Sequence, residues 1–313
     1  MNKKGMVYLL TVSFLTVSLL LIFLSHQAFE FQESQRIESS KIYAMDDFIK
    51  DVNSDVVRVL EITGYRAFVA MEDYVSVSGE FFDDKESVMA EAISDGTIRG
   101  SSAILMDESS LEDYFKRLNA ISEQRGIKAN YSIINVSLEH KSPWDVELSV
   151  FMNIFILDVQ ETAKWNYTKE FSSEISIYGL RDPLYSVMTQ NRVPNIIRSQ
   201  NQSLDSGPVL EEHIRNGHYV ESDDAPSFLQ RFENDLEPSE FGIESIVYLR
   251  DLSQQDIPVD LARPKVDFIY FNDLEIEDLA CDFTQIPEDL HLVLPEDRLD
   301  LYGLSDSSYS TNC

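Results

Sequence analysis

Two histidines lie among glutamates in the C-terminal third of the chain. Glu211, Glu212 and Glu221 flank His213 and His218. Imidazole and carboxylate groups are zinc ligands, so a metal site is one interpretation. The segment is polar and has no His-Glu-x-x-His spacing, which favours two solvated imidazoles instead. We therefore assign this segment no metal, no cofactor and no catalytic residue.

Other patterns that support catalysis are missing from the sequence. It has no Gly-x-Ser-x-Gly motif, no phosphate-binding glycine loop and no Cys-x-x-Cys pair. A carboxylate pair for glycoside hydrolysis could hide among the many acidic residues, but abundance locates no site. Tyr248, Phe268, Tyr270 and Phe271 could line a carbohydrate platform, although alternation favours Phe268 and Tyr270 as core. The sequence thus predicts no enzyme.

Two kinds of covalent modification are suggested by residue type and spacing. Candidate N-glycosylation sequons, each with Ser or Thr two positions later and no intervening proline, begin at Asn130, Asn135, Asn166 and Asn201. Cys281 and Cys313 are the two cysteines of the chain. In an oxidising setting they could form a disulfide that clamps the C-terminal tail, and the alternative is one buried and one loose thiol.

The chain is strongly acidic. Its 55 Asp and Glu residues against 25 Lys and Arg residues give a formal net charge of -30. Such a charge repels nucleic acid phosphates and anionic lipid headgroups, so we expect no nucleic-acid partner. The acidic excess is greatest in residues 201–313, yet no Asp-x-Asp-x-Asp-Gly calcium loop occurs there.

An uncharged apolar run follows three N-terminal residues, Lys3, Lys4 and Gly5. It extends from Met6 to Leu24, about 29 Å of helix at 1.5 Å per residue, close to the thickness of a bilayer core. The sequence therefore predicts a transmembrane helix over 6–25 that contacts membrane lipid. Because basic residues precede the run, residues 1–5 are expected in the cytoplasm as a basic leader and the remainder outside the cell, as in a single-pass membrane protein.

Three interpretations of this N-terminus compete: a removable signal peptide, an uncleaved anchor and a prepilin-type leader. The run is longer than a usual signal peptide, and His26 stands where a small residue is needed for cleavage. Lys3-Lys4-Gly5 before an apolar helix resembles the class III leader of archaeal type IV pilins. That resemblance implies cleavage between Gly5 and Met6. The chain departs from the bacterial pilin pattern in having Leu10 where a glutamate is found.

Helical periodicity continues beyond the apolar run. Apolar residues recur at steps of three and four, which predicts an amphipathic stem. Its stripe contains Met45, Ile49, Val52, Val56 and Val59. We expect this stripe to be the surface that holds copies or partners together. Gly64 is a candidate kink or end, Tyr65–Val77 a candidate second helix, and 111–125 a helix capped by Ser109.

Strict alternation then predicts three antiparallel strands within 127–184, with a bulge at Ile133 and Ile134. A linker or long loop over 185–208 and an acidic α+β domain over 209–313 follow. That last domain is expected to hold a helix near 225–236 and strands near 243–249 and 266–271. The predicted fold class is α+β: a transmembrane helix, a helical stem with further helices over 26–126, an antiparallel meander, and a second smaller α+β unit.

These expectations converge on a non-enzymatic, membrane-anchored extracellular protein. Its resemblance to pilins implies a role in cell-surface assembly, adhesion or envelope structure, with itself or other pilin-like subunits as partners. The alternative is an anchored ectodomain that binds or hydrolyses envelope carbohydrate. A deep pocket with two facing carboxylates would favour the alternative.

Overall fold

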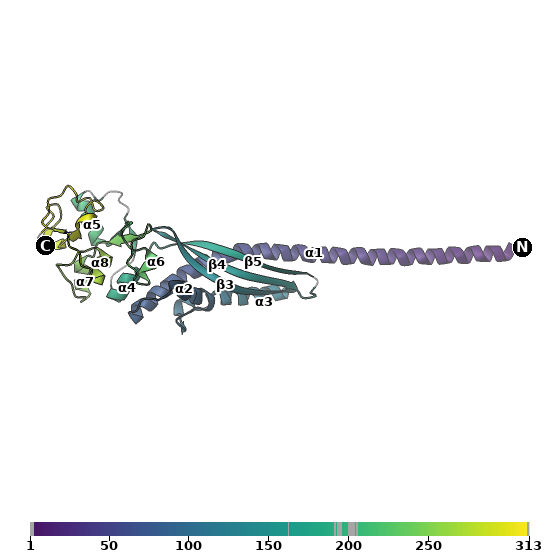
Figure 1. Ribbon diagram of the computed structural model, residues 1–313. Helices are drawn as coiled ribbons and strands as arrows, with labels where there is room; N and C mark the ends of the chain where they lie inside the picture. The colour runs from purple at the N-terminus through teal and green to yellow at the C-terminus, as the bar shows by residue number, and fades with distance from the viewer. Residues whose placement is uncertain are drawn as a thin grey trace.

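The computed structural model describes residues 3–161, 163–190, 192, 196–199, 204, 206–311 and 313. Within the first helix, the side chains at positions 3–7, 10, 28–35, 37 and 38 lie outside the description. The molecule is elongated: one long helix carries a three-stranded sheet along its second half, and a group of short elements sits at the far end (Figure 1). The helices are α1 (Lys3–Ser78), α2 (Lys85–Asp95), η1 (Ile104–Met106), α3 (Leu111–Gln124), α4 (Pro183–Thr189), α5 (Gly207–Arg215), α6 (Phe228–Arg231), α7 (Leu249–Gln254), α8 (Asp267–Asn272), η2 (Glu288–Leu290) and η3 (Glu296–Arg298). The strands are β1 (Thr97–Ile98), β2 (Ser101–Ser102), β3 (Ile127–Ser142), β4 (Asp145–Asp158), β5 (Lys164–Ser176), β6 (Ile197–Arg198), β7 (His218–Glu221), β8 (Ile243–Ser245), β9 (Leu279–Cys281) and β10 (Val293–Pro295).

Helix α1 is a single helix of 76 residues, about 114 Å long at 1.5 Å per residue. Its second half contacts β4, β5, α2 and α4. Gly64 neither kinks nor ends it, because this glycine is the point of closest approach to the sheet. A Cβ atom at Gly64 would lie 2.4 Å from Ile175 Cδ1 and 2.6 Å from Leu148 Cδ2. The candidate second helix at Tyr65–Val77 is therefore the last part of α1.

The structure does not support the transmembrane helix predicted over 6–25. Among the described residues, no helix is both long and apolar enough to cross a membrane. The predicted lipid contact and the single-pass membrane location are corrected on this finding.

Strands β3, β4 and β5 form the predicted antiparallel meander, in the order β3-β4-β5. The register shifts between Ile133 and Asn135, so the predicted bulge is present. In β4 the residues from Val146 to Ile156 alternate strictly between buried and partly exposed. The buried face of the sheet packs against α1, while α2 and α3 contact β3. This three-stranded sheet and the second half of α1 make the larger core.

Helix α3 matches the predicted helix, but its N-cap is one residue later than expected. The side chain of Ser110 accepts a hydrogen bond from the Asp113 N–H at 3.1 Å. Ser109 instead accepts a hydrogen bond from the Arg66 guanidinium. Gly126 follows the helix with a φ of 74°, the left-handed conformation predicted for this position.

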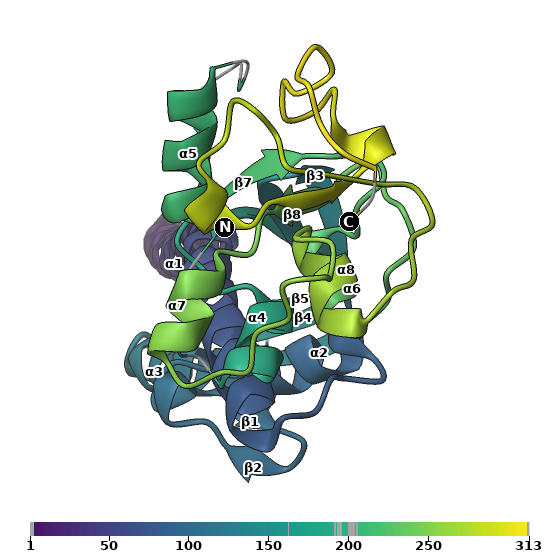
Figure 2. The ribbon, with the colours of Figure 1, turned by 90° about the vertical axis from the view of Figure 1, so that its left-hand side faces the viewer.

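The C-terminal part is an α+β arrangement of short elements gathered at the end of the meander (Figure 2). Strand β7 lies between β6, which is parallel to it, and β8, which is antiparallel. A second pair, β9 and β10, is antiparallel. Part of this region joins the larger core, including Tyr219, Phe228 and Phe232, while a second core lies around Leu210, Ile269 and other residues.

Several predicted elements of this region differ from the structure. The loop expected over 185–208 contains most of α4 and strand β6, and α5 begins before its end. The helix expected near 225–236 is only the four-residue α6, with Ser227 as its N-cap in a capping box. The stretch 266–271 is helix α8 rather than a strand. Burial of four consecutive residues, Asp267 to Tyr270, explains the error, since a strand covered on both faces and a short buried helix share this apolar pattern.

Candidate functional site

The first half of α1 carries a long exposed apolar surface. Six consecutive residues, from Leu19 to Leu24, are each between 52% and 65% exposed. Successive residues turn by about 100° around a helix, so six of them cover every side. No side of this segment is therefore shielded by the described part of the chain. The large apolar side chains exposed here are Tyr8, Leu9, Val12, Phe14, Leu15, Val17, Leu19, Leu20, Leu21, Ile22, Phe23 and Leu24.

Three hydroxyl groups in or next to this segment bond to the helix itself. Thr11 donates to the carbonyl of Tyr8 at 2.9 Å, and Thr16 donates to the carbonyl of Ser13 at 2.9 Å. Ser25 similarly donates to its own preceding turn, at 2.8 Å. A hydroxyl with an internal partner enters an apolar contact without leaving an unpaired donor. These three hydroxyl groups are thus compatible with burial of the segment.

The stem stripe lies in the protein's own core. Met45, Ile49, Val52 and Val56 are at most 9% exposed, and Val59 is half-buried against the same cluster. The sheet and the other helices cover these side chains, so the stripe is not a free surface for holding copies or partners together. The longest run of exposed apolar residues on α1 lies instead between Leu19 and Leu24, in the segment that the sequence assigned to lipid.

The other sequence-predicted site residues are spread over the molecule. Gly5 and Met6 are within helical backbone of α1, and their side chains lie outside the description. Asn130, Asn135 and Asn166 are exposed on β3 and β5. Asn201 lies outside the described residues. Cys281 and Cys313 form a disulfide, with Cα atoms 5.8 Å apart.

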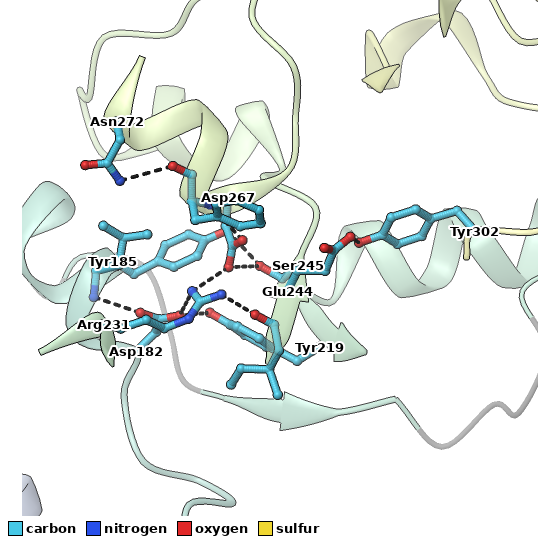
Figure 3. A network of polar contacts seen from close by, with 12 residues as sticks. Asp182, Tyr185, Tyr219, Arg231, Glu244, Ser245, Asp267, Asn272 and Tyr302 are labelled. Atoms are coloured by element: carbon cyan, nitrogen blue, oxygen red, sulfur yellow. Dashed lines mark hydrogen bonds and ion pairs between the residues drawn. The ribbon is translucent and has the colours of Figure 1, made fainter. Parts of the chain in front are cut away.

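A buried ionic cluster joins elements that are distant in sequence (Figure 3). Arg231 on α6, Asp182 at the start of α4 and Asp267 on α8 all have fully buried side chains. Arg231 Nη1 lies 2.5 Å from Asp182 Oδ2 and 2.8 Å from Asp267 Oδ2. Its Nη2 donates to the carbonyl of Ile243 on β8. One guanidinium therefore fastens three short helices and a strand.

Each carboxylate of this cluster has further partners. Asp182 accepts hydrogen bonds from the Leu184 N–H at 2.7 Å and from the Tyr219 hydroxyl at 2.9 Å. Asp267 accepts from the Phe268 N–H at 2.8 Å and from the Ser245 hydroxyl at 3.2 Å. Burial raises the pKa of Asp267, although Arg231 opposes this shift.

Two more buried carboxyl groups, those of Glu72 on α1 and Glu244 on β8, and the buried His213 on α5 have shifted pKa values. Burial raises the pKa of Glu72 to about 8 and that of Glu244 to about 7. Glu244 accepts a hydrogen bond from the Tyr302 hydroxyl at 3.0 Å and pairs with Arg298 at 3.1 Å. Burial lowers the pKa of His213 to about 4, and its ring lies 5.8 Å from that of His218.

The geometry favours a structural role for the ionic cluster of Arg231, Asp182 and Asp267. A cavity of about 30 Å³ borders Tyr185 and Tyr219, which is room for a water molecule and too little for a substrate. Among the described residues, no three His, Cys, Asp or Glu side chains are placed to hold a metal ion. A wider groove of about 410 Å³ lies between α3 and β3. Its lining holds two carboxylates, Asp95 and Glu112; both residues are exposed, and Glu112 is paired with Lys116 at 2.8 Å.

Sequence reasoning missed the ionic cluster. Asp182, Arg231 and Asp267 come from three separate segments, and nothing in the spacing of the residues links them. The one local signal was the Asp-Pro pair at 182 and 183, which is typical of a helix start, and Asp182 does cap α4.

Compared with protein-family models, with curated proteins and with solved structures, the chain shows no significant match.

Proposed function

We propose that this chain is a non-enzymatic, pilin-like assembly subunit whose copies associate through the first half of α1. The observation that carries the proposal is the change along one continuous helix. Its second half packs against the protein's own sheet, whereas the described side chains of the apolar segment from Tyr8 to Leu24 are exposed around the helix. A helix that is apolar all round belongs in the interior of something larger.

The gain from burying this segment is large. Burial of one large apolar side chain contributes about 1.5–3 kcal/mol, so the dozen exposed here amount to on the order of 20 kcal/mol before the costs of association. One neighbouring helix covers only one side of another helix. A bundle of several copies of α1 covers all sides, and its core needs only residues that this chain supplies.

The charge distribution supports the same arrangement. At a net charge of -30, copies of the chain repel one another. The residues from Met6 to Leu24 carry no charge, so contact through this segment brings helices together while the acidic parts stay at a distance. Lys3-Lys4-Gly5, which resembles a class III leader, adds the expectation that the mature subunit begins at Met6.

A pair of substitutions on the same helix tests the proposal. Leu20→Asp places a charge in the exposed apolar segment, and Ile62→Asp places one at a residue of similar exposure on the sheet-packed half. In sedimentation velocity of the full chain without detergent, wild type and Ile62→Asp are expected to form large assemblies. Leu20→Asp is expected to sediment as a monomer with an unchanged circular dichroism spectrum.

Cross-linking adds a test of which segment makes the contact. Both native cysteines are in the disulfide, so a new cysteine is the only free thiol. Ser18→Cys should give disulfide-linked dimers on oxidation, whereas Ser78→Cys at the other end of α1 should not. A monomeric wild-type protein, or equal assembly of Leu20→Asp and wild type, would overturn the proposal.

No specific observation favours the alternative, a domain that binds or hydrolyses envelope carbohydrate. The carboxylates of the ionic cluster are fully buried, and in the groove between α3 and β3 Glu112 is paired with Lys116.

A further inference from the structure

The face of the sheet turned away from α1 is polar with an apolar stripe. In β4 the even-numbered residues from Val146 to Ile156 are buried, and the odd-numbered residues from Asp145 to Leu157 keep part of their surface in solvent. We call this second side the outer face. Phe151 is 38% exposed on it, and Phe155 is half-buried. An exposed aromatic stripe on a three-stranded sheet is a surface on which another sheet can pack.

The β3 bulge decides where two sequons point. Asn130 and Asn135 are five positions apart, an odd number, so in a regular strand they would face opposite sides. The register shift between Ile133 and Asn135 removes this difference. Asn130 pairs with Phe155 and Asn135 with Phe151, which are both residues of the outer face. Both asparagines are exposed there.

The third described sequon, at Asn166, lies on the same face but on β5, the edge strand opposite β3. Asn166 on β5 also pairs with Phe155, so Asn130, Phe155 and Asn166 form one row across the three strands. Adjacent strands are about 4.8 Å apart, which places the two asparagines roughly 10 Å from each other on either side of the ring. This spacing leaves room for a sugar on each.

The hydroxyl residues of the three sequons share this face. Ser132 and Thr168 both pair with Asn153 of β4, and Ser137 pairs with Ser149. Asn153 and Ser149 are odd-numbered residues of β4 and belong to the outer face. Every sequon in the described chain therefore presents both its asparagine and its hydroxyl on one side of one sheet.

We propose that Asn130, Asn135 and Asn166 carry N-linked glycans, which cover the aromatic stripe of the outer face. The donor is an oligosaccharide linked through phosphate to a lipid. The asparagine amide nitrogen bonds to the anomeric carbon, the bond from that carbon to the phosphate oxygen breaks, and the phosphate leaves with the electron pair. The amide loses one proton, and nothing is oxidised or reduced.

The disulfide between Cys281 and Cys313 fits the same setting, because disulfides persist in oxidising compartments, where N-glycans are also attached. Bulky, hydrated sugars on this face prevent sheet-to-sheet packing. The first part of α1 extends beyond the end of the sheet (Figure 1), so glycans on the outer face leave the segment Tyr8–Leu24 free. The glycans thus restrict contact between copies to one surface.

Mass spectrometry of the full chain purified from its native cells tests this inference. Peptides that contain Asn130, Asn135 and Asn166 should each carry a hexose-containing mass addition. Asn130→Gln, Asn135→Gln and Asn166→Gln should each remove one addition from the intact mass. Asn153→Gln changes an asparagine of the same face that is not in a sequon, and it should leave the mass additions unchanged.

Thr168→Ala separates sequon-dependent glycosylation from any other modification. It keeps Asn166 but destroys its sequon, so it should remove the same mass as Asn166→Gln. Unmodified peptides at all three sites in the native protein would overturn the inference. An addition at Asn166 that survives Thr168→Ala would overturn it as well.

Discussion

Replacing Arg231 is the most informative single test of how the C-terminal part is held together. Arg231→Met keeps a side chain of similar length and apolar character but removes the cation. Two carboxylates with fully buried side chains then remain without their shared partner. Removing one member of a buried ion pair typically costs about 3–5 kcal/mol, a large share of the roughly 5–15 kcal/mol that stabilises a domain.

Substitution of either carboxylate should cost less than the loss of Arg231. With Arg231 present the cluster has two negative charges and one positive charge, so Asp267→Asn removes a like-charge repulsion and keeps an acceptor for the Phe268 N–H. We expect a loss of about 1 kcal/mol for this variant. Asp182→Asn should cost about 2–3 kcal/mol, because the new amide faces donors from Arg231 and Tyr219.

Urea unfolding at pH 7, followed by tryptophan fluorescence and by far-ultraviolet circular dichroism, measures these losses. Trp144 reports the junction directly, since its indole donates to Glu221 on β7 at 2.5 Å. Arg231→Lys is the matched control: it keeps the charge without the two-nitrogen geometry and should fall between wild type and Arg231→Met. The reasoning fails if Arg231→Met unfolds within about 1 kcal/mol of wild type, or if Asp267→Asn costs more than Arg231→Met.

The remaining predictions concern single groups in the rest of the molecule. The folded-state pKa of Glu72, about 8, exceeds the unfolded value, so the free energy of unfolding should fall as pH rises from about 4.5 to 8. Glu72→Gln should flatten that slope in urea titrations at several pH values, and an unchanged slope would contradict it. The pKa of His213 is lowered to about 4, so its contribution has the opposite sign: stability should fall as pH drops from about 6.5 to 4, and His213→Phe should reduce that fall. Gly64→Ala should cost about 1–3 kcal/mol in urea unfolding, because the new methyl group meets the sheet, and a neutral effect would show that α1 can shift outward. Reducing the bond between Cys281 and Cys313, which are separated by 32 positions, should cost about 4 kcal/mol, and an unchanged thermal midpoint would refute this expectation.

The sheet and the helical course of α1 as far as Gly64 were predictable because their patterns are long. Alternation over β4 fixes both its period and its buried face, and the doubled isoleucine at 133 and 134 marks the bulge. What the sequence could not show is which apolar surface of α1 is covered. The stripe that includes Val52 and Val56 has the periodicity of an interface and also of a core, and only the position of the sheet decides between them.

The C-terminal part resisted prediction for a different reason. Its elements are short, and their boundaries depend on contacts between distant residues. Asp267 bonds to the Phe268 N–H and to Arg231, and these contacts favour a helical turn where the apolar pattern suggested a strand. Arg231 ends a helix of four residues where the sequence suggested a longer one. Local periodicity contains no information about such pairings.

The unbroken course of α1 has a mechanical consequence. A pull on its first residues travels along the helix axis and reaches the part that packs against β4, β5 and α4. Since β5 runs alongside this part of the helix, the load acts parallel to the contact (Figure 1). Under such shear many side-chain contacts must slide at once, whereas a perpendicular pull would peel them apart one after another. The protein is thus built to resist a pull along the axis of α1 better than a pull perpendicular to it.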